Sequence, residues 1–220
     1  EDSGVLVMRN GIVGNNTHRG LSVGEFRGFA LADKYAPLIF LNGADSKAAQ
    51  MFTLAHELAH IWLGQSGISN LEETYAPHVE IERFCNSVAA KVLIPDGEIS
   101  DLWRQARSHR SPLEWLGQRF KVSTLVVLRR LRDTGLIPES FFRREYKNQE
   151  ERFARAAAKQ SGGGDYYAVQ RYRVGSRLAR AVIESTAEGK TPFREAMSLL
   201  GMKKLDTFQK FAKRHFGFSI

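Results

Sequence analysis

The stretch that decides the fold is residues 53–60, TLAHELAH, which contains the pattern His-Glu-x-x-His. Residues four apart in an α-helix lie on the same face, so a helix here would direct the imidazoles of His56 and His60 toward one point. Two such imidazoles can bind one metal ion. Glu57 would then lie beside the ion, where it can take a proton from a metal-bound water. The stretch therefore predicts a metal-dependent hydrolase.

A catalytic zinc site needs a third protein ligand and leaves a fourth position open for water. The best candidate is Glu82, 22 residues after His60, on a predicted helix from about residue 79 to 93. Asn86 lies one turn further along the same face, where its amide would accept the free N–H of a metal-bound histidine. We expect one Zn²⁺ per chain, although Mn²⁺ also suits two histidines and a glutamate. The rival third ligands are Glu72, Glu73, His78 and Glu80.

Short apolar segments precede the predicted metal-binding helix, and they predict a small sheet. Strands are expected at residues 5–8, 28–31 and 38–41. Pro37 starts the third of them, which favours an edge position. An extended peptide substrate would then pair along residues 37–42. The helix that follows should be capped by Asp45 or Ser46 and should end at Gly64.

From Asp96 onward the pattern is almost wholly helical, so the predicted fold class is α+β, a zincin-like core followed by a basic all-helical region. The expected domains are a metallopeptidase core at 1–100, a helix-turn-helix-like segment at 101–160 and a C-terminal helical segment at 161–220. A glycine run at 161–164 marks the last boundary. Further helices are expected at 113–120, 123–134, 149–159, 167–187, 192–200 and 205–215.

Charge is distributed unevenly along the chain. Residues 1–100 carry a net charge of −5 and residues 101–220 a net charge of +13. A basic half can contact DNA or an acidic protein partner, or can simply be a solvated surface. Three arginines in the predicted helix 123–134, namely Arg129, Arg130 and Arg132, are candidate DNA contacts. The apolar residues of the same helix favour packing or a protein partner instead.

Composition predicts a cytoplasmic protein without a membrane span. No apolar run reaches the length that a transmembrane helix needs, and no secretion signal is seen at the N-terminus. Cys85 is the single cysteine, which excludes an internal disulfide and suits a reducing compartment. We expect Cys85 to be a buried packing residue. The first residue is Glu1 and not Met, which suggests a processed product or an expressed fragment.

The sequence resembles the ImmA/IrrE family of bacterial and phage metallopeptidases. The resemblance rests on residues 53–60 and on residues 81–95, IERFCNSVAAKVLIP. Cys85 stands where the family usually has Ala, and Val88 where it usually has Phe. A looser resemblance, at residues 116–123 and 128–137, is to the helix-turn-helix-like segment that often follows the peptidase core.

The resemblance implies a gluzincin-type zinc site and a restricted proteolytic role. Such proteins typically cleave or inactivate a helix-turn-helix repressor and so switch on stress, mobile-element or phage genes. Tyr75 and His78 lie between the two metal-binding helices and are candidates to stabilise the oxyanion. The alternative is a regulator or antitoxin-like module that keeps the zinc site but acts by binding DNA or protein. A homo-oligomer is a further expectation.

Overall fold

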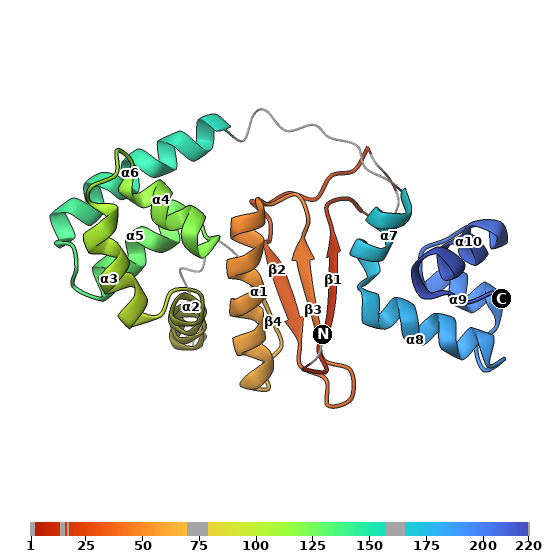
Figure 1. Cartoon of the computed structure of the whole chain (residues 1–220). Coiled ribbons are helices and arrows are strands. Elements are labelled where there is room, and N and C mark those ends of the chain that lie inside the picture. The colour runs from red at the N-terminus through yellow and green to blue at the C-terminus, as the bar shows by residue number, and fades with distance from the viewer. Residues whose placement is uncertain (1–2, 14–15, 17, 70–78, 157–165, 220) are drawn as a thin grey trace.

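The protein is described here by a computed structural model that covers residues 3–13, 16, 18–69, 79–156 and 166–219. Its fold is α+β, as the sequence predicts: a four-stranded mixed sheet is combined with a larger number of helices (Figure 1). None of the described helices is both long and apolar enough to span a membrane.

The sheet has the strand order β1-β3-β2-β4. The strands are β1 (Leu6–Asn10), β2 (Gly28–Leu31), β3 (Leu38–Asn42) and β4 (Gly67–Ser69). β3 pairs in parallel with β1 and antiparallel with β2, and β4 is added antiparallel to the far side of β2.

The predicted edge position of residues 37–42 is therefore wrong, because β3 has a partner strand on both sides. Pro37 does not prevent this arrangement, since it lies just before the strand. Its carbonyl accepts a hydrogen bond from the Leu6 amide at 2.8 Å. The missing proline N–H thus removes no bond from the ladder.

Helix α1 (Lys47–Trp62) packs on one face of the sheet. The Ser46 hydroxyl caps it by accepting from the Ala49 amide at 3.2 Å, and Gly64 follows its end with a positive φ of 66°. Apolar side chains join helix and sheet: Val5, Val7, Ile39, Leu41, Leu54, Leu58 and Ile61. This packing fixes the orientation of the helix that carries the His-Glu-x-x-His pattern.

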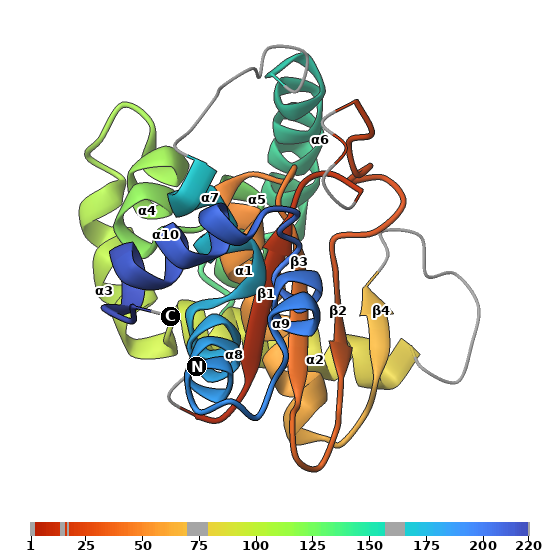
Figure 2. The same ribbon diagram turned by 90° about the vertical axis from the view of Figure 1, so that its right-hand side faces the viewer.

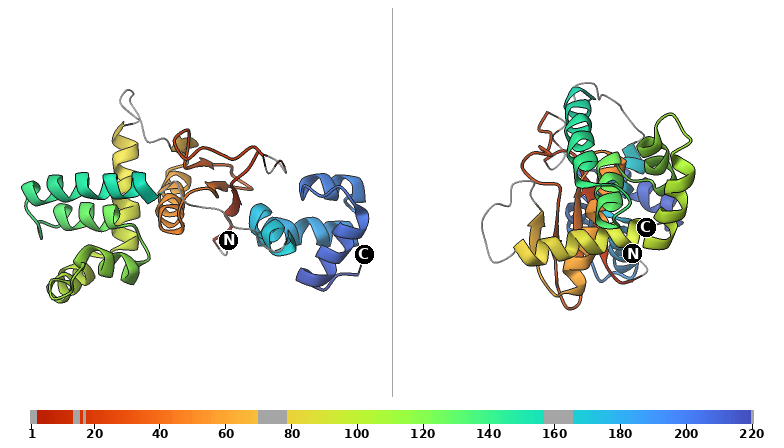
Figure 3. Two further views of the ribbon diagram at one scale, coloured as in Figure 1. Left: turned by 90° about the horizontal axis from the view of Figure 1, so that it is seen from above. Right: turned by 90° about the vertical axis from the view of Figure 1, so that its left-hand side faces the viewer.

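Two groups of helices lie on either side of this core, with the sheet and α1 between them (Figures 1 and 3). One group follows α2 (Val79–Leu93), and it comprises α3 (Asp96–Ala106), α4 (Pro112–Phe120), α5 (Thr124–Asp133) and α6 (Glu139–Ala156). The other comprises α7 (Tyr166–Val174), α8 (Ser176–Ala187), α9 (Phe193–Leu199) and α10 (Leu205–Phe216). Figure 2, viewed from the side of this second group, has α8–α10 in the foreground.

Each helical group has its own hydrophobic cluster, separate from that of the sheet and α1. The first includes Leu116, Val127 and Leu128, and the second includes Phe208 and Phe211, all fully buried. These clusters fit the predicted division at about residues 100 and 160, which stays a prediction. The glycine run that suggested the second boundary lies outside the described residues.

Two predicted helices have the wrong limits. α6 begins at Glu139, ten residues before the predicted start at 149. The single helix expected at 167–187 is two helices, because Gly175 adopts a φ of 80° and interrupts it. That backbone conformation is strained for residues with a side chain but is accessible to glycine.

Candidate metal centre

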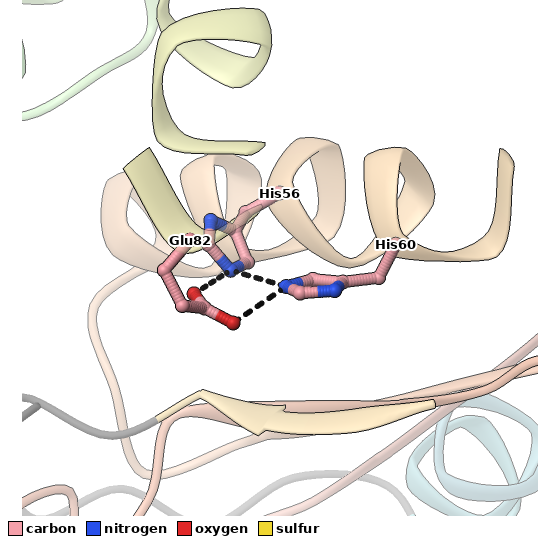
Figure 4. Close-up of side chains that lie close together, drawn as sticks. All are labelled: His56, His60 and Glu82. Atoms are coloured by element: carbon pink, nitrogen blue, oxygen red, sulfur yellow. Dashed lines mark hydrogen bonds and ion pairs between the residues drawn. The ribbon is translucent and has the colours of Figure 1, made fainter. Parts of the chain in front are cut away.

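Three side chains from two helices converge on one point beside the sheet (Figure 4). The Nε2 atoms of His56 and His60, on α1, lie 3.1 Å apart. The Glu82 carboxylate, on α2, places one oxygen 3.0 Å from the first and the other 2.9 Å from the second. Both histidines are buried. The structure thus brings together all three residues that the sequence predicts as metal ligands.

Asn86 lies where the helical spacing predicts it, one turn after Glu82. Its Oδ1 is 3.1 Å from Nδ1 of His56. Because an amide oxygen can only accept, this contact keeps the His56 proton on Nδ1. The lone pair of Nε2 is then directed toward the other two ligands, as metal binding requires.

Removal of the Asn86 amide should weaken metal binding without removing a ligand. We expect Asn86→Ala to lower zinc affinity by about 10- to 100-fold, because the His56 ring loses the contact that holds its tautomer and orientation. Competition with a zinc-binding dye measures the change. Ser87→Ala, at an exposed neighbouring position, is the matched control. Equal affinities for the two variants would show that Asn86 does not orient the ligand.

Glu82 is ionised at neutral pH in this arrangement. Burial by itself raises the pKa of its carboxyl group, but hydrogen bonds from the protonated forms of His56 and His60, together with their positive charges, outweigh that effect and lower the pKa from 4.5 to about 2. A bound cation would replace the Nε2 protons as the positive partner of the carboxylate. The centre therefore offers two imidazole nitrogens and a permanent negative charge. That combination suits a cation.

The donor set fits zinc in size as well as in chemistry. Ligand atoms at roughly 2.0–2.1 Å from a tetrahedral zinc lie about 3.3 Å from one another. The three described separations, from 2.9 to 3.1 Å, are close to this value. Two histidines and one glutamate are also a ligand set of catalytic zinc sites, in which a fourth position remains for water or substrate.

Glu57 is fully buried, with an exposed fraction of 0%. It follows the first ligand directly in α1, and its carboxylate lies close to β2. A Cβ added at Gly28 of β2 would be 3.4 Å from Glu57 Oε1 and only 2.6 Å from Thr53 Cγ2. α1 can approach the sheet this closely only because residue 28 has no side chain. Gly28 therefore helps to position the carboxylate, a role that the sequence analysis missed.

A methyl group at residue 28 should push α1 away from the sheet. Besides Thr53, it would meet the Phe40 carbonyl oxygen at 2.8 Å. We expect Gly28→Ala to lower the free energy of unfolding by about 1–3 kcal/mol, as overpacking typically does. Gly97→Ala in α3, where nothing lies within 4 Å, should be neutral or stabilising by up to about 1 kcal/mol. Urea unfolding compares the two, and equal stabilities would contradict the close approach.

One rival ligand, Glu80, does not join this centre. Glu80 is exposed and lies outside the cluster of three. The predicted oxyanion residues Tyr75 and His78, and the rival ligands Glu72 and Glu73, lie outside the described residues.

Cys85 is buried, as expected from the sequence. Burial, together with the negative charges of Glu82 and Glu57, raises the pKa of its thiol to about 11. The thiol is therefore protonated at neutral pH and unreactive.

The three arginines predicted as DNA contacts have different environments. Arg130 is buried, donates from Nε to the Ile94 carbonyl at 2.9 Å and pairs with Asp96. It holds α5 against the start of α3, and this burial removes Arg130 from the candidate DNA contacts. Arg129 is exposed and donates to the Tyr146 hydroxyl at 2.9 Å. Arg132 pairs with the adjacent Asp133. The spacing of arginines along a helix does not show which of them will be buried by a neighbouring helix.

A short strand next to the ligands also escaped the sequence analysis. β4 passes beside the second histidine, and a Cβ added at Gly67 would be 3.7 Å from Cε1 of His60. Three residues with no alternating pattern give too weak a signal for a strand prediction.

A helix with His-Glu-x-x-His, a glutamate from the next helix and an adjoining sheet together define the HExxH class of metal-binding proteins.

Comparison with known proteins identifies the family within this class. The family model of the IrrE N-terminal-like domain, peptidase M78, matches residues 1–132, and a domain of unknown function, DUF8813, matches residues 174–214. The chain therefore belongs to the IrrE N-terminal-like peptidase family, which confirms the resemblance seen in the sequence. The second match covers almost all of α8, α9 and α10.

One relative is the radiation response metalloprotease IrrE of Deinococcus radiodurans. It is 32% identical over 106 residues, which amount to 46% of this chain and 32% of that protein. The similarity thus spans about a third of the relative's length. No solved structure matches the chain.

Proposed function

We propose that the chain is a zinc-dependent endopeptidase with Glu57 as its catalytic base. The observation that carries this proposal is the fully buried Glu57 carboxylate on the helix whose two histidines converge with Glu82. A protein that used the metal only for stability would not need a buried acid next to its ligands. Membership of a peptidase family and the name of the relative support the same activity.

The residues of the chain divide the chemistry between them. His56, His60 and Glu82 would hold the zinc, which when bound supplies Lewis-acid polarisation of the scissile carbonyl and of the attacking water. Glu57 accepts the proton of the attacking water and transfers it to the nitrogen of the leaving amine. Asn86 keeps the His56 proton on Nδ1 throughout.

The proposed substrate is a helix-turn-helix transcriptional regulator that controls stress, mobile-element or phage genes. Support comes from the family resemblance and from the relative's part in a radiation response. Because β3 is interior, the peptide is proposed to pair with β4 instead. β4 bonds to β2 on one side, has no strand on its other side among the described residues, and lies beside His60.

Labelling of the protein N-termini in a cell extract tests both the proposed peptidase activity and the proposed substrate. Host extract is incubated with the zinc-loaded protein, with the chelated protein and with Glu57→Gln, and new peptide N-termini are identified by mass spectrometry. We expect new termini in a DNA-binding regulator with the zinc-loaded wild type alone. If the three samples gave the same termini, the protease proposal would be wrong. New termini confined to proteins that do not bind DNA would exclude the proposed substrate.

The alternative function, a regulator that binds DNA, has one observation in its favour, the net charge of +13 on residues 101–220. The burial of Arg130 weakens it, because one of its three candidate contacts cannot reach DNA. A DNA complex whose affinity falls steeply with salt would support this alternative.

A further inference from the structure

A cavity of about 420 Å³ lies where α7 and the start of α8 meet β1 and α1. This volume is within the range of small-molecule sites, about 300–1,000 Å³. α1 contributes Lys47, Gln50, Met51 and Leu54, whose spacing places them on one face of the helix. His56 and His60 lie on another face. The cavity is thus distinct from the metal centre. Its apolar wall consists of Val7, Leu41, Met51 and Leu54.

Three cations line the same cavity: Arg9 from β1, Lys47 from α1 and Arg171 from α7. Among the described residues, no carboxylate lines it and none of the three cations forms an ion pair. Two of them gather at one aromatic ring, with the Arg9 guanidinium carbon 4.6 Å and Lys47 Nζ 5.0 Å from the centre of Tyr172. Lys47 is exposed, so water screens its charge, but like charges near one ring still repel and an anion close to both would be favoured.

Arg9 provides a second, independent observation. Its Nε is buried and has no hydrogen-bond acceptor among the described residues. A buried N–H without an acceptor is costly and uncommon, and it marks a place where an acceptor is needed. The Nε of Arg171, by contrast, already donates to the Ser176 hydroxyl at 3.0 Å.

We propose that this cavity binds a small organic anion with an aliphatic body, of which a medium-chain carboxylate is the simplest representative. The aliphatic chain would lie against the wall formed by Leu41, Met51 and Leu54. The carboxylate would pair with Arg9 and Lys47, and a rotation of the Arg9 side chain toward it would let the buried Nε donate as well. Bound there, the ligand joins α7 to β1 and α1, so it stabilises the attachment of the C-terminal helices to the metal-binding core.

Titration calorimetry with decanoate, and with decanol as its neutral counterpart, tests the proposal on the zinc-loaded chain. We expect decanoate to bind at one site per chain and at least about tenfold more tightly than decanol. Lys47→Glu should weaken decanoate binding by about tenfold or more. Lys34→Glu, an equal charge change at an exposed position outside the cavity, should change it less than about twofold.

The variants are chosen to keep the fold intact. A glutamate at residue 47 is in the first turn of α1, where negative charge is favoured. Met51→Trp, at a position that is 41% exposed, fills the cavity without changing charge and should also weaken binding. Equal binding of decanoate and decanol, or equal effects of Lys47→Glu and Lys34→Glu, would overturn the proposal. Equal effects of Lys47→Glu and Lys34→Glu would also be seen if decanoate bound at the metal centre and not in this cavity. Absence of saturable binding would overturn it as well.

Discussion

Glu57→Gln should lower the rate of peptide hydrolysis by about 10²- to 10⁴-fold, the usual contribution of general acid–base catalysis. Glutamine has nearly the same shape but cannot accept the proton of the attacking water. Because Glu57 is not one of the three converging ligands, the variant should still bind one zinc per chain. The rate is measured on a cleaved peptide or regulator, and zinc content by mass spectrometry.

Two controls separate a catalytic effect of Glu57 from a structural one. Glu80→Gln makes the same chemical change at an exposed position on α2 and should leave the rate unchanged. Thermal unfolding of zinc-loaded Glu57→Gln should resemble that of the wild type. A variant that bound zinc normally and hydrolysed peptides within about tenfold of the wild type would exclude Glu57 as the base.

Glu82→Ala should remove stoichiometric zinc from the purified chain. This change deletes the carboxylate that approaches both Nε2 atoms, and we expect zinc affinity to fall by more than about 100-fold, beyond the effect of losing an orienting contact such as Asn86. Added zinc should then no longer raise the unfolding temperature, because a ligand stabilises only a native state that it binds.

Glu80→Ala, two residues earlier on the same helix, is the matched control and should retain one zinc per chain. Retention of zinc in both variants would mean that the third ligand lies elsewhere. The remaining predicted candidates would then be Glu72, Glu73 and His78. Loss of zinc from both variants would instead point to damage to α2 as a whole.

The sequence was most informative where structure is local. The pair His56 and His60 belongs to one helix, and the pair Glu82 and Asn86 to another, so a spacing of four residues determines which face each occupies. The caps are local as well, since Ser46 bonds to an amide three residues away. These signals predicted two helices and three converging ligands.

Features that depend on distant parts of the chain could not be predicted in this way. Whether β3 is central or at an edge depends on its pairing with β1, and Pro37 misled because it stands one residue outside the strand. Arg130 resembled its exposed neighbours until the Ile94 carbonyl was seen to lie beside it. Gly28 had no signal at all, since its role exists only where α1 touches β2.

Because its ligands come from two helices, a bound metal ion would act as a crosslink between two parts of the chain. Two ligands lie on α1 and the third on α2, so a bound ion would join His60 to Glu82, 22 positions further along, and close the segment between them into a loop. By the chain-entropy estimate used for disulfides, a crosslink over such a loop contributes about 3 kcal/mol. With a single cysteine, the chain has no internal disulfide to perform this task. Metal supply would then affect the stability of the folded protein as well as its proposed activity.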